Sequence, residues 1–281
     1  MENEIIQIQE KINNLYFDKF KNYSKNLGLS VPLIPRLSEK YFENRIIVLG
    51  QETNTWYRKT NNDLKEIFLA NKENISKICL EQRYDDFIKK YVSKYPGKFW
   101  EFNKMLYDKK IIKGKMIEND KLSHCWINLF LVEACKDKKS KEGCPTKNRK
   151  LAEEIMNLQG NLLTDILEIL KPKLIISLTG HSLDAYLRKN LFATKPEEKE
   201  IDENKILTKE MLGEFKVINK DNFLSNTKII RCYHPSYFLS RINTNKGLSE
   251  KLKKISYKGT VANYYKEQVF KKLKQLINDL K

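Results

Sequence analysis

Four short apolar runs constrain the fold of this 281-residue chain more than any other feature of its sequence. They lie at about 45–50, 125–130, 173–178 and 228–233, with helix-like stretches between them. Runs of this length that end in turn residues are typical of buried strands in a parallel sheet. Strands that alternate with helices predict an α/β fold. We expect a doubly wound, mainly parallel four-stranded sheet flanked by helices.

The remaining sequence predicts helices at both ends and two insertions. We interpret residues 1–281 as one domain with its core at about 41–241. The other expected segments are an N-terminal helix within 1–27, a helical insertion at about 61–112, a helix at about 151–170, a charged insertion at about 194–227 and a C-terminal helix at about 261–280.

Each apolar run ends in polar residues. The carboxyl ends of parallel strands meet at one edge of a sheet, and ligands bind at that edge in open α/β folds. Pro235 has no backbone N–H, so it ends the last run at His234. Alone, His234 is equally well interpreted as a cap of its own turn, but four polar ends together favour a binding site. These ends are Gln51-Glu52, Asn128, Thr179-Gly180-His181 and His234-Pro235-Ser236.

The charge of the chain favours a polyanionic partner. Lys and Arg number 53 against 36 Asp and Glu, which gives a formal net charge of +17. Such an excess attracts polyanions, nucleic acid first among them. The loop at 136–150 adds basic residues, including Lys147 and Arg149, that are candidates for phosphate contacts. A general drift toward Lys in the composition is the alternative explanation.

Other functional classes find little support in the sequence. The five cysteines include no Cys-x-x-Cys pair, so we expect reduced thiols, no metal site and no cofactor. No apolar run approaches the roughly 20 residues of a membrane span, and the first residues lack the pattern of a signal peptide. We therefore expect a cytoplasmic monomer that does not associate with membranes.

Four motifs, in this order, resemble those of the uracil-DNA glycosylase superfamily. The resemblance covers roughly Arg45 to Arg241 and leaves the termini and the long insertions outside. His-Pro-Ser is the closest match, and the order of the four motifs makes the resemblance specific. The motifs are Gly50-Gln51-Glu52, Trp126-Ile-Asn128-Leu, the segment from Lys171-Pro to Leu-Thr-Gly180, and Tyr233-His234-Pro235-Ser236.

The resemblance implies a role for each motif. Glu52 would stabilise an oxocarbenium-like sugar and orient water. His234, as a neutral imidazole, would donate a hydrogen bond to the leaving base, and Asn128 would bind the edge of a flipped pyrimidine. The other implied base-binding residues are Gly50, Gln51, Thr53 and Asn54, with Trp56 or Tyr57 stacking on the base. A DNA-binding loop that wedges into the base stack would comprise Ser236, Tyr237, Phe238, Leu239 and Arg241.

The implied function is that of a monofunctional DNA glycosylase, which hydrolyses the N-glycosidic bond of a flipped base and leaves an abasic site. The base is either uracil, in repair, or a modified pyrimidine, in defence against phage DNA. The alternative is a catalytically silent member of the fold that binds nucleic acid. By residue type alone, Glu52 could instead interact with a helix dipole, and Asn128 could be a satisfied core amide.

The first motif departs from the pattern of the superfamily. Glu52 stands where Asp, Asn or Ala is usual, Thr53 replaces Pro, and Asn54 replaces the Tyr or Gly that walls the base pocket. In many uracil-specific members that Tyr excludes thymine, so its replacement leaves room for a bulkier base. The cysteines do not match those of members with an iron–sulfur cluster, so we expect no cluster.

Overall fold

The computed structural model describes residues 2–20, 32–52, 80–92, 97–133, 144–196, 202 and 204–280. A five-stranded sheet lies at its centre with the strand order β4-β1-β5-β7-β6. The first four strands are parallel, and β6 pairs antiparallel to β7 at one edge. The five strands are β1 (Ile46–Gly50), β4 (Cys125–Asn128), β5 (Leu174–Ser177), β6 (Leu212–Phe215) and β7 (Lys228–Cys232).

This architecture confirms the predicted α/β class and the mainly parallel sheet, and it is compatible with a doubly wound fold. The predicted strand number was wrong, because β6 lies inside the segment that we interpreted as a charged insertion. The burial of Leu212 and Phe215 against β7 makes this short segment a strand. Its sequence, Leu-Gly-Glu-Phe, contains too few apolar residues to resemble the four buried runs.

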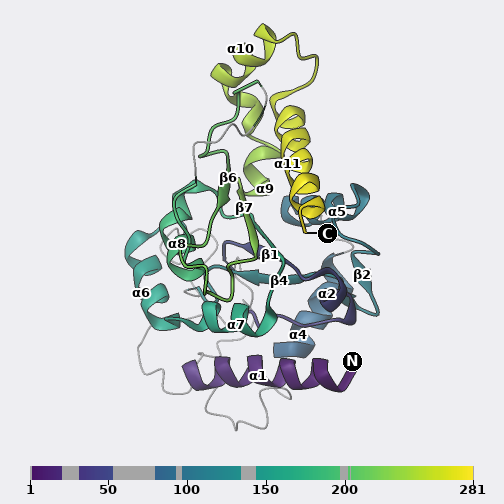
Figure 1. The fold of residues 1–281 in the computed structure, drawn as a ribbon, viewed down its shortest axis with the longest axis vertical. Coiled ribbons are helices and arrows are strands. Elements are labelled where there is room, and N and C mark those ends of the chain that lie inside the picture. Colours follow the sequence, from purple (N-terminus) through teal and green to yellow (C-terminus); the bar gives the residue numbers. More distant parts are fainter. Residues whose placement is uncertain are drawn as a thin grey trace.

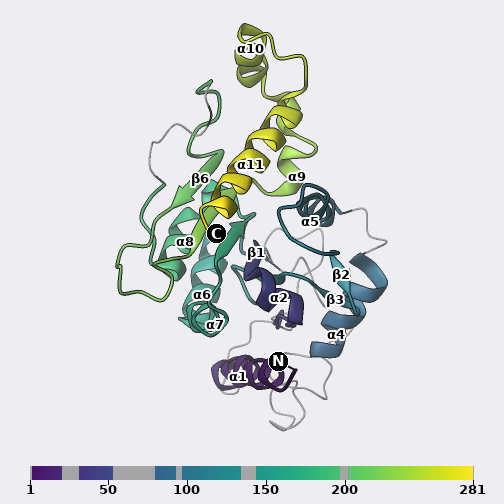
Figure 2. The ribbon, with the colours of Figure 1, turned by 45° about the vertical axis from the view of Figure 1, so that its right-hand side comes forward.

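Helices cover both faces of the sheet (Figures 1 and 2). One face, which we call the α7 face, packs against α1 (Glu2–Phe20), α6 (Arg149–Gln159), α7 (Leu162–Leu170) and α8 (Asp184–Leu191). The opposite face, which we call the α11 face, packs against α5 (Lys98–Asp108), α9 (Pro235–Phe238) and α11 (Val261–Asn278). Beyond the sheet, α10 (Lys246–Lys254) packs against α11.

The alternation of side chains along each strand builds both cores. In β1, Ile47 and Leu49 belong to the core of the α7 face, whereas Ile46 and Val48 belong to the core of the α11 face. All five residues of β1 are buried. Burial on both faces explains why the parallel strands read as continuous apolar runs.

A third cluster of buried side chains lies beside the sheet and contains two tryptophans, Trp100 and Trp126. It is built partly by α4 (Leu80–Phe87) and by a π-helical turn, Ile88–Val92, that follows it. A small hairpin of β2 (Ile117–Glu118) and β3 (Lys121–Leu122) adds Leu122.

Smaller elements complete the described chain. They are α2 (Glu39–Asn44) and the 3₁₀ turns His181–Leu183 and Ile242–Thr244. The helix predicted over 151–170 is two helices, because Gly160 takes φ 52° and interrupts it between α6 and α7. None of the helices in the described ranges combines the length and apolar character needed to cross a membrane.

Candidate active site

The carboxyl end of β1 is bonded to both neighbouring strands. Gly50 stands opposite Asn128 of β4, and the Gly50 carbonyl accepts a hydrogen bond from the N–H of Leu129 at 2.9 Å. On the other side, Gln51 Nε2 donates to the carbonyl of Thr179 at 2.8 Å. The predicted base-binding Gln51 therefore uses its amide nitrogen to join the ends of β1 and β5.

Asn128 is buried, with 1% of its surface exposed, and its amide has a defined orientation. Trp126 Nε1 lies 3.2 Å from Asn128 Oδ1. Because an indole N–H only donates, the oxygen of the amide faces Trp126 and the nitrogen faces away from it. Asn128 Nδ2 has no hydrogen-bond acceptor within the described part of the chain. A buried donor without an acceptor costs about 1–3 kcal/mol, so this nitrogen is suited to a ligand that brings one.

The close contact with Asn128 requires a glycine at position 50. A Cβ atom at Gly50 would lie 2.2 Å from Asn128 Oδ1, far inside van der Waals contact. The glycine thus permits the close approach of the Asn128 side chain to the backbone of β1.

Glu52 is held by Thr146, a residue of the segment that precedes α6. The N–H of Thr146 donates to Oε2 at 3.1 Å, and its hydroxyl donates to Oε1 at 2.9 Å. Burial raises the pKa of Glu52 above its ordinary value, while the two bonds from Thr146 and the charge of Lys147 oppose that rise. Both carboxylate oxygens are fixed, which suits a group that must stabilise a developing positive charge.

His234 follows β7 and begins the short helix α9. Its Nδ1 accepts a hydrogen bond from the N–H of Ser236 at 3.2 Å, so the histidine does cap its own turn. Burial lowers the pKa of His234 to about 4, which leaves the ring neutral at pH 7. A neutral ring that accepts at Nδ1 carries its proton on Nε2, so Nε2 is a hydrogen-bond donor.

The strand register brings Glu52 and His234 to the same edge of the sheet. Leu49, Ser177 and Arg231 stand side by side on β1, β5 and β7. Glu52 comes three residues after Leu49, and His234 comes three residues after Arg231. Strands are spaced about 4.8 Å apart, so β1 and β7 lie about 10 Å from each other, enough for a ring to fit between the two side chains.

Phe99 of α5 extends this arrangement with an aromatic ring. Its centroid lies 5.7 Å from that of Trp126 and 6.5 Å from that of His234, with an angle of 25° between the Phe99 and His234 rings. It therefore lies between the Asn128 side and the His234 side of the site. The spacing of Phe99 on an apolar helix face gives no signal of this position in the sequence.

The predicted DNA-binding loop is partly helix and partly core. Ser236 and Arg241 are exposed, and Tyr237 and Leu239 are half-buried. Phe238 is fully buried, with its ring centroid 5.3 Å from that of Phe102. The side chain of Phe238 therefore belongs to the core beneath α9, and its role in a DNA-binding loop stays a prediction.

Of the other predicted site residues, the structure describes two. Lys147 is exposed next to Thr146, and Arg149 is exposed and paired with Glu153 at 2.9 Å. The remaining predicted base-binding residues, Thr53, Asn54, Trp56 and Tyr57, lie outside the described residues.

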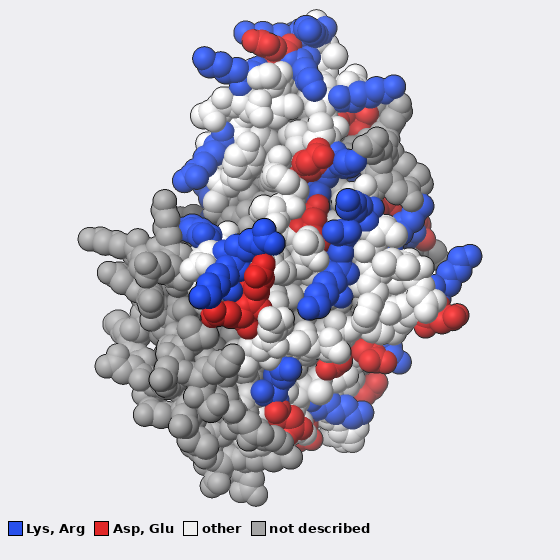
Figure 3. Space-filling view, turned by 90° about the vertical axis from the view of Figure 1, so that its left-hand side faces the viewer, with Lys and Arg blue, Asp and Glu red and all other residues white. Residues whose placement is uncertain are grey.

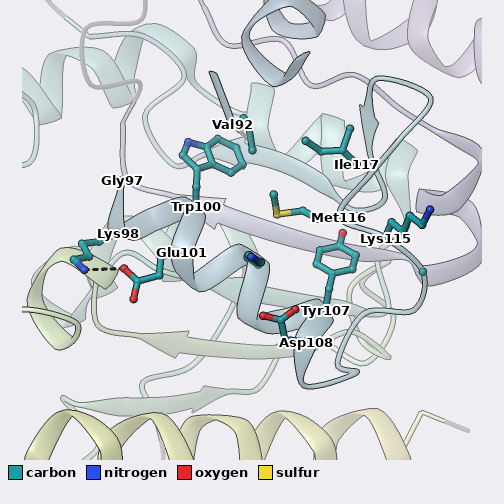
Figure 4. A pocket seen from close by; sticks show the side chains of 12 residues that line it. Val92, Gly97, Lys98, Trp100, Glu101, Tyr107, Asp108, Lys115, Met116 and Ile117 are labelled. Carbon is teal, nitrogen blue, oxygen red and sulfur yellow. Dashed lines mark hydrogen bonds and ion pairs between the residues drawn. The ribbon is translucent and has the colours of Figure 1, made fainter. Parts of the chain in front are cut away.

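A separate pocket of about 720 Å³ lies beside α5 (Figure 4). The side chains of Trp100, Tyr107 and Met116 surround it, and Lys98 and Glu101 form an ion pair of 2.7 Å at its border. It shares Trp100 with the third cluster, but it contains none of the motif residues. We therefore place the candidate site at the sheet edge.

No group of three or more His, Cys, Asp or Glu side chains in the described residues is placed to hold a metal ion. No family model, no curated protein and no solved structure matches the chain. The candidate function therefore rests on the order of the motifs and on the geometry at the sheet edge.

Proposed function

We propose that the protein is a monofunctional DNA glycosylase that flips a uracil or a modified pyrimidine out of DNA and hydrolyses its N-glycosidic bond. The observation that carries this proposal is the pairing of two donors at one sheet edge. His234 is a neutral ring with its proton on Nε2, and Asn128 is a buried amide whose Nδ2 has no acceptor among the described residues. Both suit a base that carries ring carbonyl or ring nitrogen acceptors.

His234 stabilises the negative charge that develops on the leaving base. As the bond between C1′ and the base nitrogen breaks, its electron pair moves onto the base, and negative charge builds on the carbonyl next to that nitrogen. A donor already oriented toward this oxygen stabilises the transition state more than the ground state. The bond from Ser236 to Nδ1 fixes the ring and its tautomer for this role.

Glu52 acts on the sugar. The carboxylate stabilises the positive charge at C1′ and accepts a proton from the water that attacks there. The products are an abasic sugar with a hydroxyl at C1′ and a base anion. Glu52 releases its proton to solvent, and the base anion takes one up to become the neutral free base. Thr146 holds both carboxylate oxygens, so Glu52 needs little reorganisation during the reaction.

Asn128 and Phe99 would position the base before cleavage. With Oδ1 turned to Trp126, the Nδ2 donor of Asn128 suits a carbonyl oxygen of uracil or the ring nitrogen of a cytosine derivative. The ring of Phe99 lies between Trp126 and His234 and suits stacking on the base. The replacement of the pocket-wall residue by Asn54 supports including bulky 5-substituted pyrimidines among the substrates.

The test is a release assay on duplex and single-stranded DNAs that carry uracil, 5-hydroxymethylcytosine or glucosylated 5-hydroxymethylcytosine. Treatment with alkali converts each abasic site into a strand break. We expect breaks at one of these bases and none at the unmodified pyrimidines. His234→Ala should lower the single-turnover rate at least 100-fold, whereas His234→Gln, which retains a donor, should recover part of it.

Glu168→Gln serves as a matched control for Glu52→Gln, because Glu168 is an exposed carboxylate on α7. The control should cleave at the wild-type rate, and Glu52→Gln should not. If the protein binds these DNAs but releases no base from any of them, the silent nucleic-acid-binding alternative replaces the enzyme.

A further inference from the structure

A second polar pocket, of about 190 Å³, lies on the α7 face of the sheet beside β7. The helix α8 provides Asp184 and Arg188, and the charged segment at about 194–227 provides Lys195 and Lys209. Arg231 of β7 closes it from the sheet side. None of the motif residues Glu52, Asn128 and His234 lines it.

The pocket's buried ion pair is already satisfied. Arg231, whose side chain is 1% exposed, donates from Nε and Nη2 to the two oxygens of Asp184 at 2.9 and 3.0 Å. Nη1 and Nη2 also donate to the carbonyls of Glu210 and Lys209 at 2.7 and 2.6 Å, respectively. Arg231 and Asp184 thus cancel each other and offer little charge to a ligand.

The other charged side chains leave a positive excess. Besides the pair of Arg231 and Asp184, the described lining residues include the basic side chains of Arg188, Lys195 and Lys209 and the carboxylate of Glu210. Arg188 Nε is buried and has no hydrogen-bond acceptor within the described residues. A guanidinium with a buried, unpaired N–H suits an oxyanion, which accepts several hydrogen bonds from one group.

This pocket also lies close to the end of β7. His181 lines it, and its ring meets the ring of Tyr233 edge-on with centroids 6.0 Å apart. Tyr233 directly precedes His234, so the pocket lies beside the strand end that carries His234.

We propose that this pocket, which we call the anion pocket, binds a phosphate-class oxyanion through Arg188 and Lys195. The source of the phosphate is either the backbone of a nucleic acid that crosses the sheet edge or free phosphate. The proposal does not depend on cleavage of a glycosidic bond, because it concerns residues outside the candidate active site.

The histidines provide a direct measurement. The chain contains three, of which His181 lines the anion pocket, His124 is buried elsewhere and His234 belongs to the candidate active site. Inorganic phosphate titrated at constant ionic strength should shift the ring-proton NMR signals of His181 in a saturable way. The signals of His124 should stay unchanged.

Variants identify the groups that bind. The double variant Arg188→Gln/Lys195→Gln should weaken phosphate binding at least tenfold, and Lys195→Gln alone should weaken it measurably. The control Lys189→Gln removes the same charge from an exposed neighbour on α8 and should stay within twofold of the wild type. A linear, non-saturating shift, or equal affinities in the double variant and the wild type, overturns the proposal.

A short duplex without any modified base distinguishes the two sources. If the duplex shifts the His181 signals and inorganic phosphate competes with it, the ligand is a backbone phosphate. If the duplex leaves His181 unchanged while inorganic phosphate still saturates it, the ligand is free phosphate. Neither result requires base release, so this experiment tests the anion pocket independently of the proposed glycosylase activity.

Discussion

At the scale of single residues, two titrating groups set the pH dependence of the proposed reaction. Glu52 must be ionised, and burial raises its pKa above the ordinary glutamate value. His234 must be neutral, and burial lowers its pKa to about 4. Activity should therefore fall with decreasing pH as Glu52 takes up a proton, before His234 does so. Single-turnover rates from pH 3.5 to 8 measure this.

In Glu52→Gln, the decrease in rate that follows protonation of Glu52 should be absent, and the residual rate should fall only near pH 4, where His234 takes up a proton. An unchanged decrease in this variant would assign the titration to another group. Glu168→Gln, at its exposed position, should keep the wild-type profile.

Gly50 offers a second test at the same scale. Because a Cβ at this position would lie 2.2 Å from Asn128 Oδ1, Gly50→Ala must displace the amide from Trp126. Such overpacking costs about 1–3 kcal/mol of the free energy of unfolding, measurable by urea denaturation. Gly247→Ala is the control, since its nearest atom lies 3.6 Å away and α10 gains up to about 1 kcal/mol from alanine. Equal free energies of unfolding for the two variants would show that a side chain at position 50 does not clash with Asn128.

The sequence placed some of the candidate residues but not their partners. Gly50 and Asn128 end strands, Glu52 and His234 come just after strand ends, and strand ends can be predicted from apolar runs. Thr146 comes from a segment almost a hundred residues after Glu52, so no local pattern connects them. Phe99 shows the same limit, because an apolar helix position looks alike whether it faces the core or the border of a site.

At the scale of elements, the buried pair of Arg231 and Asp184 joins β7 to α8 and to the segment before β6. Arg231→Met leaves a partly buried carboxylate and two carbonyls without their donor. Removing one partner of a buried pair costs about 3–5 kcal/mol. Thermal or urea unfolding should show this loss.

A matched surface pair provides the control. Arg149 and Glu153 lie at the same 2.9 Å separation, but the Arg149 side chain is 88% exposed against 1% for Arg231. Arg149→Met should leave stability unchanged within error, because water and salt screen an exposed pair. Similar losses of stability in Arg231→Met and Arg149→Met would show that burial does not determine how strongly an ion pair stabilises the fold.

The contact between β6 and Arg231 also explains why the sequence did not predict the fifth strand. β6 contains Gly213, which lets Arg231 pass close by, since a Cβ there would lie 2.9 Å from Nη2. A strand with a central Gly and one charged residue lacks the apolar signature of a buried strand. Its place is set by its pairing with β7, which is a long-range property.

At the scale of the whole molecule, positive charge gathers at the end formed by α10 (Figures 1 and 3). Lys246, Lys251, Lys253 and Lys254 are all exposed on this helix. If this end contacts DNA, Lys251→Glu/Lys254→Glu should weaken binding and make its salt dependence shallower. The slope of log K against log salt should lose about 0.9 for each phosphate contact removed. Fluorescence anisotropy between 50 and 300 mM salt measures this.

The control reverses two charges at the opposite end of the molecule, on α1 (Figures 1 and 2). Lys11→Glu/Lys19→Glu should change the salt slope much less than the α10 variant, because both residues lie far from α10. The same slope in both double variants would mean that the net charge of +17 acts as a whole rather than through α10.

The bond from Trp126 to Asn128 also gives the candidate site an optical signal of its own. The rings of Trp126 and Trp100 meet edge-on with centroids 4.8 Å apart, and the chain contains three tryptophans in all. Two of its three indoles thus belong to one cluster beside the amide that would read the base. A base that enters there changes the polarity around Trp126, so the intrinsic fluorescence of the unlabelled protein should follow base flipping in real time.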